Sequence, residues 1–346
     1  MKTHAIIPIF IPHIGCPHDC VFCNQRKITA RLSAPTTAEI EQLIERNLST
    51  IEPRGIRDVE VAYFGGSFTG LPIEEQNELL KPAIRYRSQG RIKHIRLSTR
   101  PDYIDDEIVS NLLAQGVDIV ELGVQSFDDE VLAVSNRGHD AKSSETAFAL
   151  LKTAGIEVGL QLMAGLPCST PERDIASARR VSELRPDSTR IYPTVILKDT
   201  TLHDMHQDGT YVPPTQDEMV ETVKQMYLIL EDAGITILRV GLKSTDIITS
   251  NGDAVSGSYH PAFRQLIESS IARDKIEAEI ASKMKVLGEG TSSLGELTIY
   301  ANPKNISCAA GHKGSNRDYF AKKYPNLSLK FISNSSIPEG TYEVLI

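Results

Sequence analysis

Three cysteines near the N-terminus have the residue type and the spacing to hold a metal centre. Cys16, Cys20 and Cys23 are spaced C-x3-C-x2-C, and no fourth cysteine lies close to them in the sequence. An iron–sulphur cluster that is held by thiolates normally takes four of them. Three ligands on a four-iron cluster leave one iron open to a ligand from outside the protein, and the spacing favours such a cluster.

Two other interpretations of these cysteines remain. A structural zinc site could use His18 as a fourth ligand beside the three thiolates, but zinc motifs usually come as two ligand pairs with a longer spacer between them. A disulfide framework fits poorly, because five cysteines in 346 residues are few and odd in number. The other two, Cys168 and Cys308, stand alone, and an isolated cysteine is most often a small buried residue.

Length and composition describe an ordinary soluble protein. The chain has 346 residues, of which 40% are hydrophobic and 24% charged, with a formal net charge of −8, so it can bury a large core. Pro8 and Pro12 interrupt the apolar N-terminal run, which does not resemble a signal peptide. No apolar stretch approaches membrane-spanning length. Thiolates kept for metal imply a reducing compartment, and we expect a cytoplasmic protein without a membrane partner.

The hydrophobic pattern predicts a parallel sheet with crossover helices, because short apolar runs alternate with longer amphipathic stretches. Right-handed crossovers curl such a sheet toward a barrel, so we predict an α/β fold, a partial (β/α)6 TIM-like barrel. The six predicted strands are residues 5–11, 59–64, 92–98, 117–124, 157–163 and 189–195. The predicted helices are residues 37–49, 72–85, 105–115, 143–153, 171–184 and 217–232.

Beyond about residue 240 the alternation fades. We predict a division into a barrel at residues 1–245 and a C-terminal α+β extension at residues 246–346 that packs on it. The extension is expected to contain a helix from residue 261 to about residue 281 and strands at residues 297–300 and 328–333.

Polar and glycine residues recur where the predicted strands end, and active sites of barrels gather at that edge. The cysteine segment follows the first strand, and Gly65, Gly66 and Ser67 follow the second. Two glycines let a ligand approach the backbone closely. Further polar side chains are expected at the same level, namely Ser98, Arg100, Gln125, Gln161 and Tyr192.

Three basic features have both a functional and a structural interpretation. Arg137 is predicted to open the helix that follows the fourth strand. Lys198 follows the sixth strand and could contact an anionic substrate or lie in solvent. A run without acidic residues could grip phosphates or mark a solvated helix end; it comprises Arg85, Arg87, Arg91, Lys93, Arg96 and Arg100.

Together these segments resemble the radical S-adenosylmethionine enzymes. Within that superfamily the chain is similar to the radical domain of the Elongator catalytic subunit and its short bacterial relatives, and more distantly to oxygen-independent coproporphyrinogen oxidase. Besides the cysteines and the glycine pair, the matching segments are residues 98–102, 123–126, 136–139, 165–167, 190–194 and 258–263.

The resemblance implies a [4Fe-4S] cluster on Cys16, Cys20 and Cys23 that binds S-adenosylmethionine through its open iron. It further implies roles for cofactor-binding residues along the chain. Gly65, Gly66 and Ser67 would hold the methionine amino group, Arg137 the carboxylate, Ser98 and Gln125 the ribose or methionine, Gln161 and the Phe22 backbone the nucleoside, with Arg100 also at the cofactor.

The implied activity is reductive cleavage of S-adenosylmethionine to a 5′-deoxyadenosyl radical that removes hydrogen from a substrate. An external one-electron donor of the flavodoxin or ferredoxin type would reduce the cluster. The Elongator likeness implies uridine in tRNA as substrate. Alternatives are a small molecule such as a tetrapyrrole, or a protein whose metal is purely structural. Coproporphyrinogen oxidases carry an acidic residue where this chain has Ser98, and an aspartate where it has Gln161. These two differences disfavour coproporphyrinogen as the substrate. The sequence does not identify a catalytic residue, and Tyr192 and Lys198 are the candidates for that role.

Overall fold

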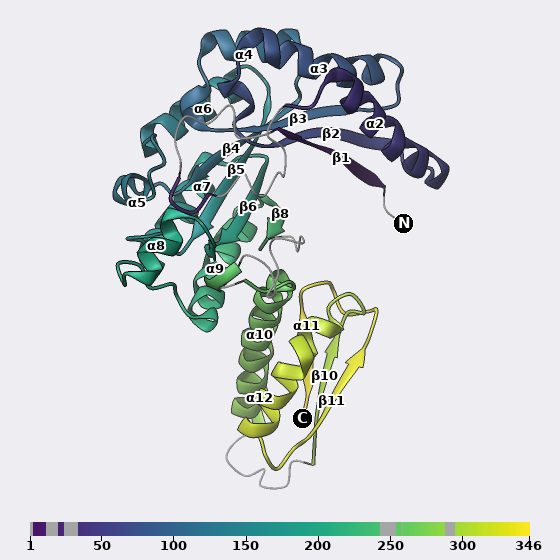
Figure 1. The fold of residues 1–346 in the computed structure, drawn as a ribbon. Coiled ribbons are helices and arrows are strands. Elements are labelled where there is room, and N and C mark those ends of the chain that lie inside the picture. Colours follow the sequence, from purple (N-terminus) through teal and green to yellow (C-terminus); the bar gives the residue numbers. More distant parts are fainter. Residues whose placement is uncertain (1–2, 12–19, 24–33, 243–253, 258, 288–294) are drawn as a thin grey trace. The chain divides into compact units, whose positions relative to one another are not determined.

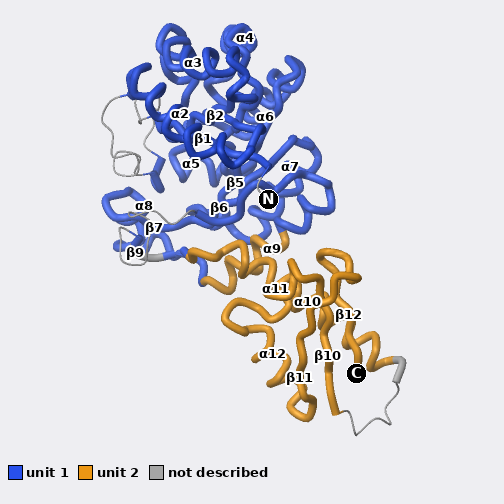
Figure 2. The backbone as a smooth tube through the Cα atoms, turned by 90° about the vertical axis from the view of Figure 1, so that its right-hand side faces the viewer, with its two compact units in different colours: residues 1–215, 226–259 blue, residues 216–225, 260–346 orange. Residues whose placement is uncertain are grey.

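The computed structural model of the protein describes residues 3–11, 20–23, 34–242, 254–257, 259–287 and 295–346. The chain forms two compact units, residues 1–215 with 226–259 and residues 216–225 with 260–346 (Figure 2). The sequence-based division at residue 245, with the extension packed on the barrel, stays a prediction.

A parallel, curled sheet is the centre of the first unit, as the sequence predicts (Figure 1). Its strands follow one another in space in chain order, each paired with the next in parallel. In the described residues they are β1 (His4–Ile11), β2 (Asp58–Gly65), β3 (His94–Thr99), β4 (Ile119–Gln125), β5 (Glu157–Ala164), β6 (Ser188–Pro193) and β8 (Thr236–Val240).

Strand β8 is the seventh strand of this sheet, so the predicted count of six was one too low. Its bulged register against β6 and its half-exposed side chains weaken the signal of a buried strand. The predicted sixth strand also ends earlier, at Pro193, and the Thr194 amide and hydroxyl both donate to the Ala164 carbonyl at the end of β5, at 2.9 Å and 2.7 Å. The next residues form a separate strand, β7 (Val195–Leu197), which pairs antiparallel with β9 (Ala254–Gly257).

Helices connect the strands and cover the outer face of the sheet (Figure 1). The core lies between them: Ile40, Ile44 and Leu48 of the helix at Thr37–Ile51 are buried, and the Tyr63 hydroxyl of β2 donates to the Leu79 carbonyl at 2.7 Å. The helices are α2 (Thr37–Ile51), α3 (Ile73–Ser88), α4 (Asp106–Ala114), α5 (Asp129–Val134), α6 (Ala141–Thr153), α7 (Pro171–Leu184) and α8 (Thr201–Gln207). A further helix, α9 (Gln216–Asp232), is divided between the two units at residue 225.

The helix ends obey local sequence signals. Thr36 and Glu39 form a reciprocal capping box at the start of α2, and the Thr170 hydroxyl accepts from the Arg173 amide at the start of α7. Gly116 and Gly155 follow α4 and α6 with positive φ, where residues other than glycine are strained. These signals explain why most predicted helix bounds agree with the structure to within three residues.

The second unit is an α+β unit. A three-stranded sheet of order β11-β10-β12 packs on helices, and its core includes Ile276, Ile280, Ile299 and Phe320. Its elements are α10 (Phe263–Leu287), β10 (Glu296–Ala301), α11 (Ile306–Ala310), α12 (Ser315–Lys323), β11 (Ser328–Ser333) and β12 (Tyr342–Leu345). Both strands that were predicted here are present, and β12 was missed. Within the described ranges, no helix has the length and apolar character needed to cross a membrane.

Candidate cofactor site at the carboxyl end of the sheet

Two of the three predicted ligand cysteines lie in a short, well-anchored segment. Cys16 lies outside the described residues. Cys20 is 7% exposed and Cys23 is partly buried, and a turn joins them in which the Cys23 amide donates to the Cys20 carbonyl at 2.9 Å. Through Val21 the segment contacts Ser135, in the connection after β4, and Leu202, which follows β7, so it lies beside segments that follow strands.

Neighbouring elements hold this segment from both sides through Val21. The Val21 amide donates to the Ser135 carbonyl after α5 at 3.2 Å, and the Val21 carbonyl accepts from the Leu202 amide in α8 at 2.7 Å. The Val21 side chain packs with Ile196, Leu202 and Tyr211, and Phe22 packs against the same cluster. The position of the cysteines is therefore fixed by parts of the chain more than a hundred residues away.

Arg137 is the charged side chain that meets the cysteine segment. Its Nη1 donates to Cys20 Sγ at 3.2 Å, and its Nη2 donates to the Gly123 carbonyl. The side chain is buried, and Nε has no hydrogen-bond partner among the described residues. A guanidinium stabilises negative charge on sulphur, the form in which cysteine binds metal. The local prediction was wrong in one respect: Arg137 lies between α5 and α6 and does not open a helix, because α5 was missed.

The glycine pair after β2 touches the end of β1. The Gly66 amide donates to the Ile11 carbonyl at 3.0 Å, and a Cβ on Gly65 would lie 2.4 Å from the same oxygen. Gly65 also has a φ of +111°, a conformation that side chains disfavour. The sequence requires glycine here for close backbone approach, which brings the glycine turn next to the strand that leads to the cysteines. Ser67 is buried directly after this turn.

Two glutamines meet at the edge of β4 and β5. Gln161 Nε2 donates to Gln125 Oε1 at 3.1 Å. Gln125 ends β4 with a φ of 70°, and Asn136 and Cys168, which follow β4 and β5, also have left-handed backbone, as do Arg185, Asp199 and Lys313 elsewhere in the described residues. Left-handed non-glycine residues gather at functional sites because other contacts must hold them there. This observation marks the carboxyl edge as a constrained region.

Arg100 and His139 occupy a buried corner beside this edge. The Arg100 guanidinium forms two hydrogen bonds of 2.9 Å with the Asp102 carboxylate, and His139 Nδ1 lies 3.8 Å from the same group. Burial lowers the pKa of His139 to about 4, an effect that the charge of Arg137 reinforces. The His139 ring is therefore neutral at neutral pH. The predicted cofactor residue Arg100 thus has a carboxylate partner that the sequence did not suggest.

The remaining predicted residues are spread over the inner face and the rim. Ser98 lies within β3, where its hydroxyl donates to Glu121 at 3.3 Å. Tyr192 lies in β6 beside Arg190, and Lys198 is exposed after β7. Sequence reasoning missed the charge cluster inside the sheet, which consists of the buried Glu60, Arg96 and Glu121 and the partly buried Arg190, although charged residues within predicted strands could have indicated it.

The basic run between residues 85 and 100 is neutralised by the fold. Arg91 pairs with Glu45 and Glu52, whose carboxylates come from α2 and the turn after it. Arg96 is buried among the sheet's own carboxylates. The interpretation of this run as a phosphate-binding surface is therefore not supported, because acidic residues outside the run pair with its basic side chains. The other pairs are Arg85 with Glu41, Arg87 with Asp118, Lys93 with Asp58 and Arg100 with Asp102.

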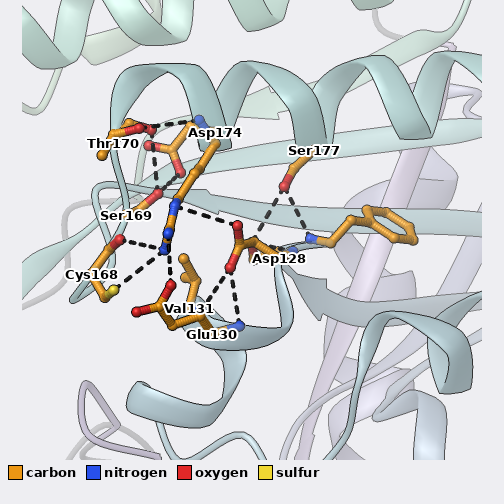
Figure 3. A network of polar contacts seen from close by, with 11 residues as sticks. Asp128, Glu130, Val131, Cys168, Ser169, Thr170, Asp174 and Ser177 are labelled. Carbon is orange, nitrogen blue, oxygen red and sulfur yellow. Dashed lines mark hydrogen bonds and ion pairs between the residues drawn. The ribbon is translucent and has the colours of Figure 1, made fainter.

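A polar network fixes the turn after β5 (Figure 3). Arg173 of α7 donates to the Cys168 carbonyl at 3.1 Å and to Glu130 of α5 at 2.6 Å. Asp174 accepts from the Gly165 amide at 2.8 Å and from the Ser169 hydroxyl. The network thereby joins the turn to α5, which precedes Ser135 and Arg137.

The network makes folding stability depend on pH through Asp174. Burial raises the pKa of this carboxyl from 3.8 to about 6, against the opposing effect of its hydrogen bonds. The folded protein therefore holds the proton more readily than the unfolded chain, and this stabilisation is lost as the pH rises through about 6. Between about pH 5 and about pH 7.5 we expect the wild type to lose about 1 to 1.5 kcal/mol relative to Asp174→Asn.

Denaturant unfolding at both pH values measures this difference. Asp106→Asn, at an exposed position on α4, is the matched control and should follow the wild type. A difference between wild type and Asp174→Asn that does not vary with pH would contradict the assignment.

Two family models and several known proteins match this chain. The model described as the radical SAM superfamily matches residues 10–179, and the model described as the radical SAM C-terminal domain matches residues 186–273. The chain is 25% identical over 297 residues to the tRNA uridine(34) acetyltransferase of Methanocaldococcus infernus, covering 70% of this chain and 54% of that protein. It is 30% identical over 275 residues to human Elongator complex protein 3, covering 65% of this chain and 49% of that protein.

A solved structure shares the fold. The archaeal Methanocaldococcus infernus Elp3 with an N-terminal deletion matches with a TM-score of 0.63 and 20% identity, over 79% of this chain and 64% of that chain. The chain spans about half the length of the curated relatives named above. The first family model covers the cysteine segment, the glycine turn, both glutamines and Arg137, so the matched region and the constrained edge coincide. This chain belongs to the radical S-adenosylmethionine superfamily of enzymes.

Proposed function

We propose that this protein holds a [4Fe-4S] cluster on Cys16, Cys20 and Cys23 and cleaves S-adenosylmethionine reductively. The observation that carries the proposal is the contact of Arg137 with Cys20 in a cysteine segment that is fixed at the carboxyl edge of the sheet. A guanidinium that donates to a buried sulphur stabilises the thiolate form, which is the form that binds metal. The radical SAM family model covers the same residues.

The side chains and backbone groups around the cysteines fit the cofactor. Arg137 keeps a buried Nε without a partner among the described residues, which could donate to the methionine carboxylate. We propose that Gly65, Gly66 and Ser67 receive the methionine amino group. We propose Ser98 and Gln125 for the ribose or methionine portion and Gln161 and the Phe22 backbone for the nucleoside. Arg100, which pairs with Asp102, is also proposed at the cofactor.

The chemistry that the bound group supplies is cleavage of a carbon–sulphur bond, which yields a 5′-deoxyadenosyl radical able to remove hydrogen from a substrate. The chain's own part is to orient that group and to exclude water. Val21, Leu202 and Tyr211 bury one side of the cysteine segment with apolar surface. The electron would come from an external donor of the flavodoxin or ferredoxin type, which agrees with a cytoplasmic location.

Product analysis tests this function. The chain is reconstituted anaerobically with iron and sulphide, reduced with dithionite and incubated with S-adenosylmethionine. We expect 5′-deoxyadenosine and methionine to form in equal amounts. If neither product exceeds the level of a control without protein, the proposed function is wrong.

For the substrate we propose uridine in tRNA. The support is the name of the Methanocaldococcus infernus relative, a tRNA uridine(34) acetyltransferase. The acetyl-dependent reaction of those longer proteins is not part of the proposal, because the chain spans about half of their length. A small molecule such as a tetrapyrrole is the alternative substrate class.

A pair of transcripts distinguishes these substrates. We expect a tRNA with uridine at position 34 to accelerate the formation of 5′-deoxyadenosine, and the same tRNA with cytidine there to have no effect. Equal rates with both transcripts and without RNA would remove tRNA and leave a small molecule.

A further inference from the structure

The inner face of the curled sheet carries a chain of buried charges. Glu121 of β4 is 6% exposed, and its Oε1 accepts from Arg96 of β3 at 2.8 Å and from Arg190 of β6 at 2.8 Å and 2.9 Å. Its other oxygen accepts from Ser98. Glu60 of β2, which is 2% exposed, pairs with Arg96. The two carboxylates and the two guanidinium groups balance one another in charge.

Arg239 of β8 adds a third positive charge to this face. The register of the sheet sets it directly beside Arg190, and it is partly buried. Among the described residues, no carboxylate lies within ion-pair distance of Arg239. The Glu121 carboxylate does not balance the charge of Arg239, because Arg96 and Arg190 already share that carboxylate. Like charges on paired strands repel each other, so this corner carries an excess of positive charge that an anion would stabilise.

Tyr192 completes a set of donors at the same corner. It lies two residues after Arg190 on β6, so both side chains point to the same face of the sheet. The Tyr192 oxygen accepts from Arg190 Nη1 at 3.5 Å, a contact that leaves the hydroxyl proton for another acceptor. The Phe64 ring lies 5.5 Å from the Arg190 guanidinium carbon and supports that side chain from β2.

We propose that Arg190, Tyr192 and Arg239 form a binding site for an anionic group, a carboxylate or a phosphate, inside the sheet. Paired arginines and a hydroxyl are the donors that recognise such groups. Gln161, which is proposed above for the nucleoside, is the register partner of Arg190 on the other side. The site therefore lies one strand from the cofactor, and its assignment to the substrate's anionic group rests on the proposed function.

Anion-dependent stabilisation of the anaerobic holoprotein tests the site. The unfolding temperature is measured against increasing inorganic phosphate and, separately, acetate, with chloride holding the ionic strength constant. We expect a saturable rise with at least one anion, and Arg239→Gln should weaken the apparent affinity by about tenfold or more. Arg239→Lys keeps the charge and should retain most of the affinity. Arg179→Gln, at an exposed position on α7, is the matched control and should bind like the wild type.

The outcomes separate this site from the proposed function. A rise with phosphate alone assigns a phosphoryl group, and a rise with acetate alone assigns a carboxylate. No saturable rise with either anion, or equal affinity in Arg239→Gln and wild type, would overturn the proposal. Cys20→Ala should lose cleavage of S-adenosylmethionine and keep the anion effect. Cleavage without an anion effect refutes the anion site alone, whereas an anion effect without cleavage in the wild type refutes the proposed function and leaves the site as an anion site.

Discussion

Replacing Cys20 by Ala is expected to reduce the formation of 5′-deoxyadenosine to the level of a control without protein. The segment from Cys20 to Cys23 is anchored through Val21 to Ser135 and Leu202, so the fold fixes the position of the Cys20 thiolate. A cluster with two remaining thiolates is not held in a defined position. The iron content after reconstitution and the yield of 5′-deoxyadenosine measure the two parts of this effect.

Cys308→Ala is the matched control for this experiment. Cys308 is a buried cysteine in α11 of the second unit, and the same substitution there should leave iron content and product yield unchanged. If Cys20→Ala retained the wild-type yield, Cys20 would not be a ligand. If both variants lost activity equally, the loss would come from damage to the fold in general.

Replacing Glu121 by Gln is expected to lower the free energy of unfolding by about 3 to 5 kcal/mol, because removing one partner of a buried ion pair leaves an uncompensated charge. Glu121 accepts from both Arg96 and Arg190, and all three side chains are largely buried. In the variant, Glu60 would be the remaining carboxylate of this chain of charges. Urea unfolding of the whole protein, monitored by circular dichroism, measures the change in the free energy of unfolding.

Glu107→Gln provides the comparison, since Glu107 is exposed on α4 and should change the stability by less than about 0.5 kcal/mol. If Glu121→Gln changed the free energy of unfolding by a similarly small amount, water or rearranged side chains would be stabilising the charges of Arg96 and Arg190. That result would also weaken the charge balance on which the anion site depends.

Most of the fold could be predicted because the signals that specify it are local. The run of alternating strands and helices indicates a parallel sheet, and caps such as Thr36 and Thr170 set where helices begin. Strand β8 escaped because its five residues are bulged and half exposed. The short helix α5 also escaped, since six residues give too little periodicity to recognise.

The site could be predicted as a set of residues but not as a set of contacts. The cysteine spacing and the glycine pair identify the loops, because such residues have few other uses at strand ends. The contact between Arg137 and Cys20 joins positions 117 residues apart, and no local pattern indicates it. The pairing of the basic run with Glu45 and Glu52 likewise depends on how α2 packs beside α3. Such contacts depend on the tertiary structure, and the local sequence does not indicate them.

The measurement that tests the central claim most directly is the electron paramagnetic resonance spectrum of the reduced, reconstituted protein with and without S-adenosylmethionine. If the cluster has an open iron that binds the methionine groups, we predict a [4Fe-4S]⁺ signal whose g-values shift when S-adenosylmethionine is added. In Cys20→Ala that shift should be absent. A wild-type signal that stays unchanged on addition of S-adenosylmethionine, or a protein that binds zinc and no iron, would contradict the account.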